Sequence, residues 1–85
     1  MTNSPSRSDK IVTQVYTRCV FFRNSNSTII EQQVNYFLSF APLSELRRME
    51  TNIIDGEILI SLWFDPMPEA DNIDLVYSEA LNIAK

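Results

Sequence analysis

The chain has 85 residues, of which 45% are hydrophobic and 21% are charged, and its formal net charge is −4. This length predicts one domain with a single small core, and the acidic balance disfavours nucleic-acid binding, which usually requires a basic excess. Because the sequence has no histidine, one cysteine and one glycine, it excludes histidine-dependent nucleophiles, internal disulfides and glycine-rich phosphate loops, and we expect neither enzymatic activity nor a metal or cofactor.

The first nine residues, MTNSPSRSD, are polar and have no apolar segment. This composition predicts a flexible tail over 1–9 and does not fit a signal peptide. No apolar run approaches the roughly 20 residues that span a bilayer. We therefore expect a cytoplasmic protein without a membrane segment, whose single domain occupies residues 10–85.

Residues 10–23, KIVTQVYTRCVFFR, are rich in β-branched and aromatic side chains. That composition predicts a long strand. The alternation of a strand places Tyr16, Val20 and Phe22 on one face and a second apolar set, which includes Cys19, on the other. Both faces are apolar, so we expect one to meet the core and the other to meet a partner, with Cys19 serving as a packing residue.

An amphipathic helix is predicted over residues 28–40. Its apolar positions recur with a helical period and comprise Ile30, Val34, Phe37, Leu38 and Ala41. At its start, Thr28 and Glu31 fit a capping box, in which each side chain bonds a backbone N–H of the first turn. Pro42 disfavours helical conformation in the preceding residue and ends the element.

Asp55 and Gly56 separate two β-rich runs and predict a hairpin with a two-residue turn. This turn fixes the cross-strand pairs of one face, which we expect to meet the helix: Ile53 with Ile58, Thr51 with Ile60, and Met49 with Leu62. The opposite face carries Ile54, Leu59 and Trp63. Residues 43–48 fit either a helical turn before the strand or the start of the strand itself, and both alternatives are kept.

A proline-containing loop over 65–72 precedes a second helical pattern. Its apolar positions are Ile73, Val76, Tyr77, Ala80, Leu81 and Ala84. This spacing predicts an amphipathic helix that runs to the end of the chain. Asp71 or Asn72 is expected to cap it, and Asp74 suits the positive end of the helix dipole.

The predicted fold is α+β in the order β-α-β-β-α. It is a three-stranded sheet with two helices on one face, which corresponds to a ferredoxin-like unit without its last strand. In the complete unit that last strand lies beside the first strand, which here becomes an apolar edge. We expect this edge to pair with that of a second copy, giving a homodimer or higher oligomer. The competing interpretation is that the C-terminal helix or tail covers it.

Residues 10–64 resemble a family of very small bacterial and phage proteins that includes a sporulation-associated member in Bacillus. The resemblance rests on the β-α-β-β order and on VNYFLS, Val34–Ser39, within the first helix. It covers about two thirds of the chain, and the C-terminal helix and the polar tail depart from it. The resemblance implies the fold and a bacterial or phage origin, hence a location inside a bacterial or infected bacterial cell. It implies nothing about chemistry.

We expect a non-catalytic protein that oligomerises and binds another protein. Its small size, acidic charge and lack of catalytic groups suit a phage-type inhibitor of a host defence system, which is an inference by analogy. Aromatic side chains commonly anchor such contacts. The predicted partner surface is the sheet face formed by Tyr16, Val20, Phe22, Leu59 and Trp63.

The alternative prediction is sequestration of a phosphate-bearing nucleotide between protomers. Arg23 precedes a helix N-terminus, where free N–H groups and the helix dipole favour anions. A parallel crossover places Arg23 and Arg47 at opposite ends of the sheet, so the arginines converge only across a dimer interface. The candidate ligand residues are Arg18, Arg23, Ser27, Thr28, Arg47 and Arg48. The competing interpretation is that these arginines are solvated and form salt bridges.

Overall fold

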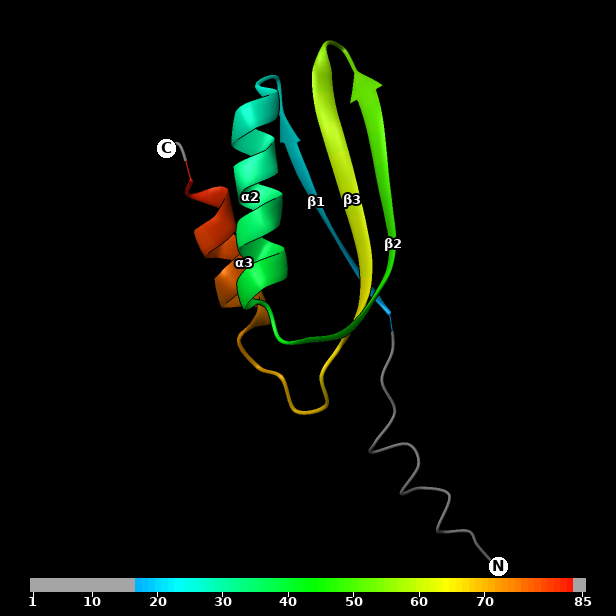
Figure 1. Cartoon of the computed structure of the whole chain (residues 1–85), viewed down its shortest axis with the longest axis vertical. Coiled ribbons are helices and arrows are strands. Elements are labelled where there is room, and N and C mark those ends of the chain that lie inside the picture. The colour runs from blue at the N-terminus through cyan, green and yellow to red at the C-terminus, as the bar shows by residue number, and fades with distance from the viewer. Residues whose placement is uncertain (1–16, 84–85) are drawn as a thin grey trace, which may run out of the picture.

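The computed structural model describes residues 17–83. The elements along the chain are β1 (Arg18–Asn24), α2 (Ser27–Phe40), β2 (Leu43–Ile54), β3 (Glu57–Pro66) and α3 (Ile73–Leu81). The strands form one antiparallel sheet in the order β1-β3-β2, and both helices lie on the same face of it (Figure 1). This confirms the predicted α+β fold. The predictions for the tail, for the strand before residue 17 and for residues 84–85 lie outside the described residues.

The β2–β3 hairpin has the predicted turn and register. Asp55 and Gly56 both have positive φ, 53° and 78°, as a two-residue turn of this hand requires. All three predicted pairs of the helix-side face are present, including Thr51 opposite Ile60. Residues 43–48 belong to the strand and form no helical turn. β2 carries two register shifts in this part, between Leu43 and Glu45 and between Leu46 and Arg48.

The helix α2 begins one residue earlier than predicted, and its cap is different. Asn26 has extended backbone angles, and its side-chain oxygen accepts hydrogen bonds from the N–H groups of Thr28 and Ile29 at 2.9 and 3.2 Å. The predicted capping box of Thr28 and Glu31 is therefore wrong, because Thr28 already lies inside the first turn. Asn ranks above Thr as a cap, since its short amide oxygen reaches these N–H groups well. Ala41 returns to extended backbone and ends the helix before Pro42.

Aromatic side chains from both layers form the centre of the core. Phe22 of β1, Phe37 of α2 and Phe64 of β3 are fully buried, and the Phe37 ring lies 6.0 Å from that of Phe22 and 5.5 Å from that of Phe64. Tyr77 of α3 adds an edge-to-face contact with Phe22 at 5.3 Å. Truncation of a buried phenylalanine to alanine typically lowers stability by about 3–5 kcal/mol, so this cluster holds the helices on the sheet.

The predicted grouping of Val20 and Phe22 with Leu59 and Trp63 on one sheet face is wrong. Val20 and Phe22 are only 7% and 1% exposed and lie beneath the helices, whereas Leu59 and Trp63 lie on the helix-free face. The reason is that both alternate sets of β1 are apolar, so alternation alone does not indicate which set meets the core. The register with β3 decides it, because Val20 lies opposite the buried Leu62.

Candidate protein-binding groove

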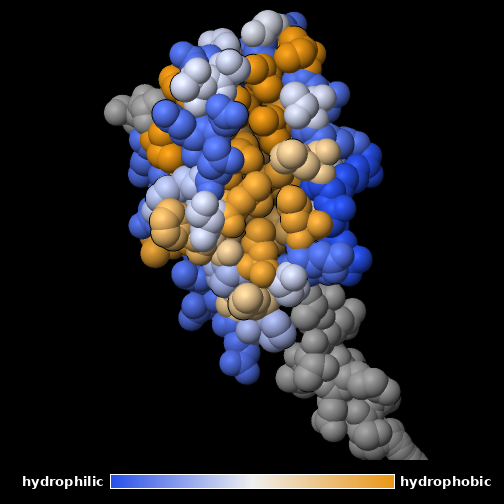
Figure 2. Space-filling model, in the orientation of Figure 1, coloured by the Kyte–Doolittle hydropathy of each residue, from blue (hydrophilic) through white to orange (hydrophobic). Residues whose placement is uncertain are grey.

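An apolar groove lies between α2 and β2 on the helix side of the sheet. Its volume is about 430 Å³. The lining residues are Ser27, Ile30, Glu31, Val34 and Asn35 of α2, Met49 and Thr51 of β2, and Ile58 and Ile60 of β3. In the space-filling view it is a continuous hydrophobic strip with hydrophilic residues on both sides (Figure 2). The groove combines a sheet floor with one helical wall.

The groove exists because the helix layer is narrower than the sheet. α2 contacts β1 and β3, and α3 packs beside α2, so neither helix covers β2 (Figure 1). The helix-side residues of β2 are consequently exposed: Met49 by 55% and Ile53 by 67%. The cross-strand partner of Met49, Leu62, is in contrast fully buried on the same face. The sheet therefore presents an apolar strip that the chain's own described helices leave open.

The groove boundary carries negative charge. Glu31 is the one ionisable residue among those that line it. Residues 17–83 contain four arginines and ten carboxylates, a net charge of −6. Glu31 at the groove and Asp55 at the hairpin turn have no arginine within 4 Å in this part of the chain. Such a boundary favours a ligand that is apolar in the middle and basic at its edges.

Each of the four described arginines has a carboxylate partner. The ion pairs are Arg18 with Asp74 at 2.8 Å, Arg23 with Glu57 at 2.6 Å, Arg47 with Asp65 at 2.6 Å, and Arg48 with Glu50. The arginines therefore do not converge within one chain. Arg23 faces Glu57 at the hairpin end of the sheet, while Ser27 and Thr28 lie in the first turn of α2. This arrangement matches the salt-bridge interpretation, since each arginine of residues 17–83 already contacts a carboxylate.

Asp65 of β3 makes side-chain contacts that join β3 to β2. Asp65 is buried, and its two carboxylate oxygens accept hydrogen bonds from the Thr17 hydroxyl at 2.8 Å and from Nε of Arg47 at 2.7 Å. The Arg47 hydrogen bond, followed by that of Thr17, lowers the pKa of the Asp65 carboxyl. Both donors stabilise the charged form, so the carboxylate is an anchor at the bulged end of β2 and not a proton donor.

The helix-free face of the sheet is a second, less open surface. The guanidinium of Arg48 lies over the Trp63 ring at 5.0 Å from its centroid, which covers part of the indole. Leu59 is half-buried, and Phe21 is exposed beside Cys19. Burial, with a smaller contribution from Glu50, raises the pKa of the Cys19 thiol, which makes it less nucleophilic. Of the predicted partner residues, only Leu59 and Trp63 share this face, and Tyr16 lies outside the described residues.

Among residues 17–83, no group of three or more acidic or cysteine side chains is arranged to hold a metal ion. No helix in this part of the chain is long and apolar enough to cross a membrane.

No protein-family model, curated protein or solved structure matches the chain. The resemblance of residues 10–64 to small bacterial and phage proteins stays a prediction.

The sequence predicted the cross-strand partners of Met49 and Ile53 correctly, but it did not predict the groove. The missing step concerns coverage: two helices packed side by side cover two strands, and the third strand of the sheet is left open. The signal was present in β2, whose helix-side residues are Met49, Thr51 and Ile53.

Proposed function

We propose that the protein is a non-catalytic interaction module that binds an amphipathic, basic helix of a partner protein in the groove between α2 and β2. The observation that carries the proposal is the exposed helix-side face of β2. Met49 lines the groove opposite Ile30 and Val34 of α2 and is 55% exposed, and Ile53, on the same face beyond the groove, is 67% exposed. Exposed apolar strips bordered by polar residues are typical of protein-binding surfaces.

A helix is the ligand shape that best suits this groove. The groove is lined by α2 on one side and by residues of β2 and β3 on its floor, and no helix lies over β2 (Figure 1). A helix placed about 8–10 Å from α2 would continue this layer and bury Met49 and Ile53. It would contact the sheet with apolar residues at i, i+3, i+4 and i+7, which is the usual pattern of helices bound in grooves.

The charges specify the ligand further. Glu31 on the α2 wall has no arginine partner in the described part of the chain, and that part has a net charge of −6. A lysine or arginine on the flank of the bound helix would meet Glu31 and add to the rate of association. Nucleotide sequestration, in contrast, requires free positive charge, and the four described arginines are already paired.

The proposal is tested with a synthetic helical peptide of leucine and lysine, 18 residues long, and a matched peptide in which glutamate replaces lysine. We expect the lysine peptide to shift the amide NMR signals of α2 and β2 around the groove, and the glutamate peptide to bind at least tenfold more weakly. Shifts confined to the helix-free face, or equal binding of both peptides, would contradict the proposal.

Two pairs of variants separate groove binding from general attraction. Met49→Ser removes an apolar side chain from the groove floor, and Met67→Ser removes an equally exposed methionine from the loop after β3. Glu31→Lys reverses charge in the groove, and Asp71→Lys makes the same change before α3. We expect Met49→Ser and Glu31→Lys each to weaken lysine-peptide binding about tenfold, with the two controls near wild type.

A further inference from the structure

The two edges of the sheet are not equivalent. β1 is contacted from the side by α3: the Tyr77 hydroxyl donates to the Phe21 carbonyl oxygen at 2.6 Å, and Asp74 pairs with Arg18 at 2.8 Å. Of the two predictions for the β1 edge, these contacts favour the one in which the C-terminal helix covers it over the one in which it pairs with a second copy. In contrast, no hydrogen bond from outside the sheet reaches the backbone of residues 49–54 within the described part of the chain. β2 is the accessible edge.

The outer edge of β2 presents a regular row of backbone groups. The two-residue turn makes Ile54 and Glu57 the closing hydrogen-bonded pair of the hairpin. Alternation then directs the N–H and C=O groups of Met49, Thr51 and Ile53 away from β3. Both register shifts of β2 lie before Met49, so this stretch is unbroken. Such an edge is a template for another strand.

We propose that β2 pairs antiparallel with β2 of a second copy of the chain, with the twofold axis at Thr51. This pairing forms a continuous six-stranded sheet, and the proposal does not rest on which ligand the groove binds. On the helix side, Met49 of each copy faces Ile53 of the other, and the two Thr51 residues face each other. The exposed apolar side chains of β2 thereby gain an apolar cross-strand neighbour.

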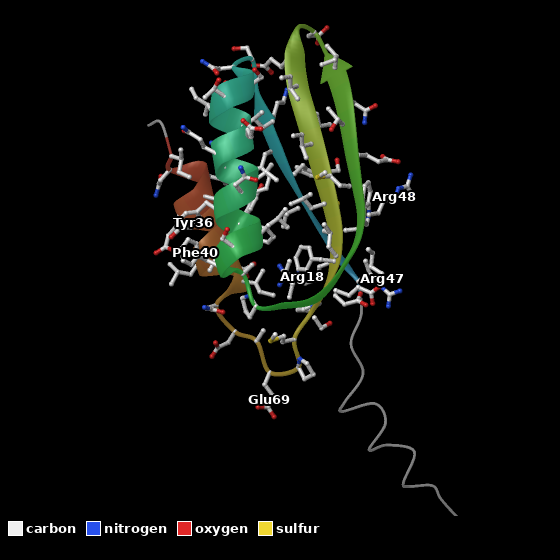
Figure 3. The ribbon with its side chains drawn as sticks, viewed as in Figure 1. Arg18, Tyr36, Phe40, Arg47, Arg48 and Glu69 are labelled. Carbon is white, nitrogen blue, oxygen red and sulfur yellow. The ribbon has the colours of Figure 1, made fainter. Side chains whose placement is uncertain are left out.

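Charge complementarity selects this register. Arg48 projects from β2 towards one end of the strand (Figure 3), whereas Arg47 is the extra residue of the bulge and bonds Asp65 of its own chain. Asp55 lies at the other end of β2 without an arginine partner in the described residues. With the axis at Thr51, Arg48 of one copy lies opposite Ile54 of the other and next to Asp55. Arg48 already pairs with Glu50 of its own chain, but 63% of its side chain is exposed, so its remaining N–H groups can reach Asp55 of the second copy. The contact occurs twice, once at each end of the paired strands.

Neighbouring registers are less favourable. An axis at Glu50 brings the two Glu50 side chains opposite each other, and like charges directly opposite are destabilising. An axis at Asn52 places the apolar Met49 opposite Asp55. Only the Thr51 register joins apolar residues to apolar residues while bringing Asp55 next to Arg48.

The register is tested by disulfide cross-linking in a Cys19→Ser background. Hydrogen-bonded residues opposite each other in an antiparallel pair have Cα atoms about 5.5 Å apart, within the range of a disulfide. We expect Thr51→Cys to form a covalent dimer on mild oxidation. Ile53→Cys is the control, because the two residue-53 positions are about 13 Å apart along the paired strands. Cross-linking of Ile53→Cys as fast as Thr51→Cys would overturn the register.

The edge itself is tested by the mass of the protein in solution, measured by analytical ultracentrifugation. We expect the wild-type chain to be a dimer. Thr51→Pro removes an N–H that points away from β3, so the monomer keeps its ladder, and we expect the dissociation constant of the dimer to rise at least tenfold. Far-ultraviolet circular dichroism verifies that this variant is folded. A monomeric wild-type mass, or a folded Thr51→Pro variant that dimerises normally, would exclude pairing through β2.

Discussion

Asp65 is a buried carboxylate that joins three parts of the chain. Its oxygens accept hydrogen bonds from Arg47 in β2 and from Thr17 just before β1, and its backbone oxygen accepts one from the Ser44 hydroxyl at 3.1 Å. These contacts lie where β2 has its register shifts. A bulge leaves ladder groups without their regular partners. The side-chain bonds around Asp65 compensate for this loss and fix the bulged end of β2 in place.

This network makes stability dependent on pH below the ordinary carboxyl range. The pKa of Asp65 is lowered from 3.8 in the folded state, first by the Arg47 hydrogen bond and then by that of Thr17. The unfolded chain therefore binds a proton at a higher pH than the folded chain does. The stabilisation is complete above pH 3.8 and is lost as pH falls through the lower pKa of the folded state.

We accordingly expect Asp65→Asn to be less stable than wild type in urea unfolding at pH 7, with the difference shrinking as pH falls below 3.8. Asp71→Asn is the control, because Asp71 is exposed and has no arginine within 4 Å among the described residues. Its stability should follow that of wild type throughout. If the difference in unfolding free energy between wild type and Asp65→Asn stays constant down to pH 2, the charge of Asp65 does not stabilise the fold.

At the scale of single elements, the start of α2 shows how a local motif is chosen. Asn24, Asn26 and Thr28 all lie close to the helix start. The side chain of Asn24 accepts the N–H of Asn26 at 2.8 Å, and Asn26 in turn caps the helix. The polar stretch before α2 is thus a turn followed by a cap, built from asparagines.

Substitution of these residues distinguishes the two caps. Asn26→Ala should lower the free energy of unfolding by about 1 kcal/mol, the usual effect of removing a side-chain cap. Thr28→Ala should change it by much less, because the Thr28 side chain lies within the first turn. Urea unfolding of both variants provides the measurement. A larger loss for Thr28→Ala than for Asn26→Ala would support the capping box instead.

The elements differ in how far the sequence determines them. The hairpin register was predictable because Asp55-Gly56 permits one tight turn, and that turn fixes the pairs from Ile54–Glu57 to Arg48–Trp63. The two register shifts beyond Arg48 did not follow from it. The existence of both helices followed from their apolar period, but α3 ends at Leu81, short of the predicted end, and Asn72 makes no side-chain hydrogen bond at its start. The sequence did not indicate which face of β1 meets the core, because both faces of this strand are apolar. The partners of the arginines also could not be predicted: Arg23 bonds a residue 34 positions away and Arg18 one 56 positions away, so only the assembled fold brings them together.

At the scale of the whole molecule, the groove and the β2 edge become one surface. In the proposed dimer the two uncovered β2 strands lie side by side at the centre of the sheet. α2 contacts both β1 and β3, so its axis lies above the space between them. The two copies of α2 are then about four strand spacings apart, roughly 19 Å. This is twice the usual distance of about 8–10 Å between packed helices, so the valley between them has room for one helix.

The combined proposals therefore predict a stoichiometry. Titration of the wild-type dimer with the leucine–lysine peptide, followed by isothermal calorimetry, should saturate at one peptide per two chains. In Thr51→Pro the groove has a single helical wall, and we expect one peptide per chain. Because Thr51 itself lines the groove, the comparison is with Thr51→Ala, which loses the same side chain but keeps the N–H for pairing. We expect at least tenfold weaker binding to Thr51→Pro than to Thr51→Ala, since each bound helix loses its contacts with the second α2. Saturation of the wild-type dimer at one peptide per chain would mean that each groove binds separately, and that dimerisation through β2 does not build a shared site.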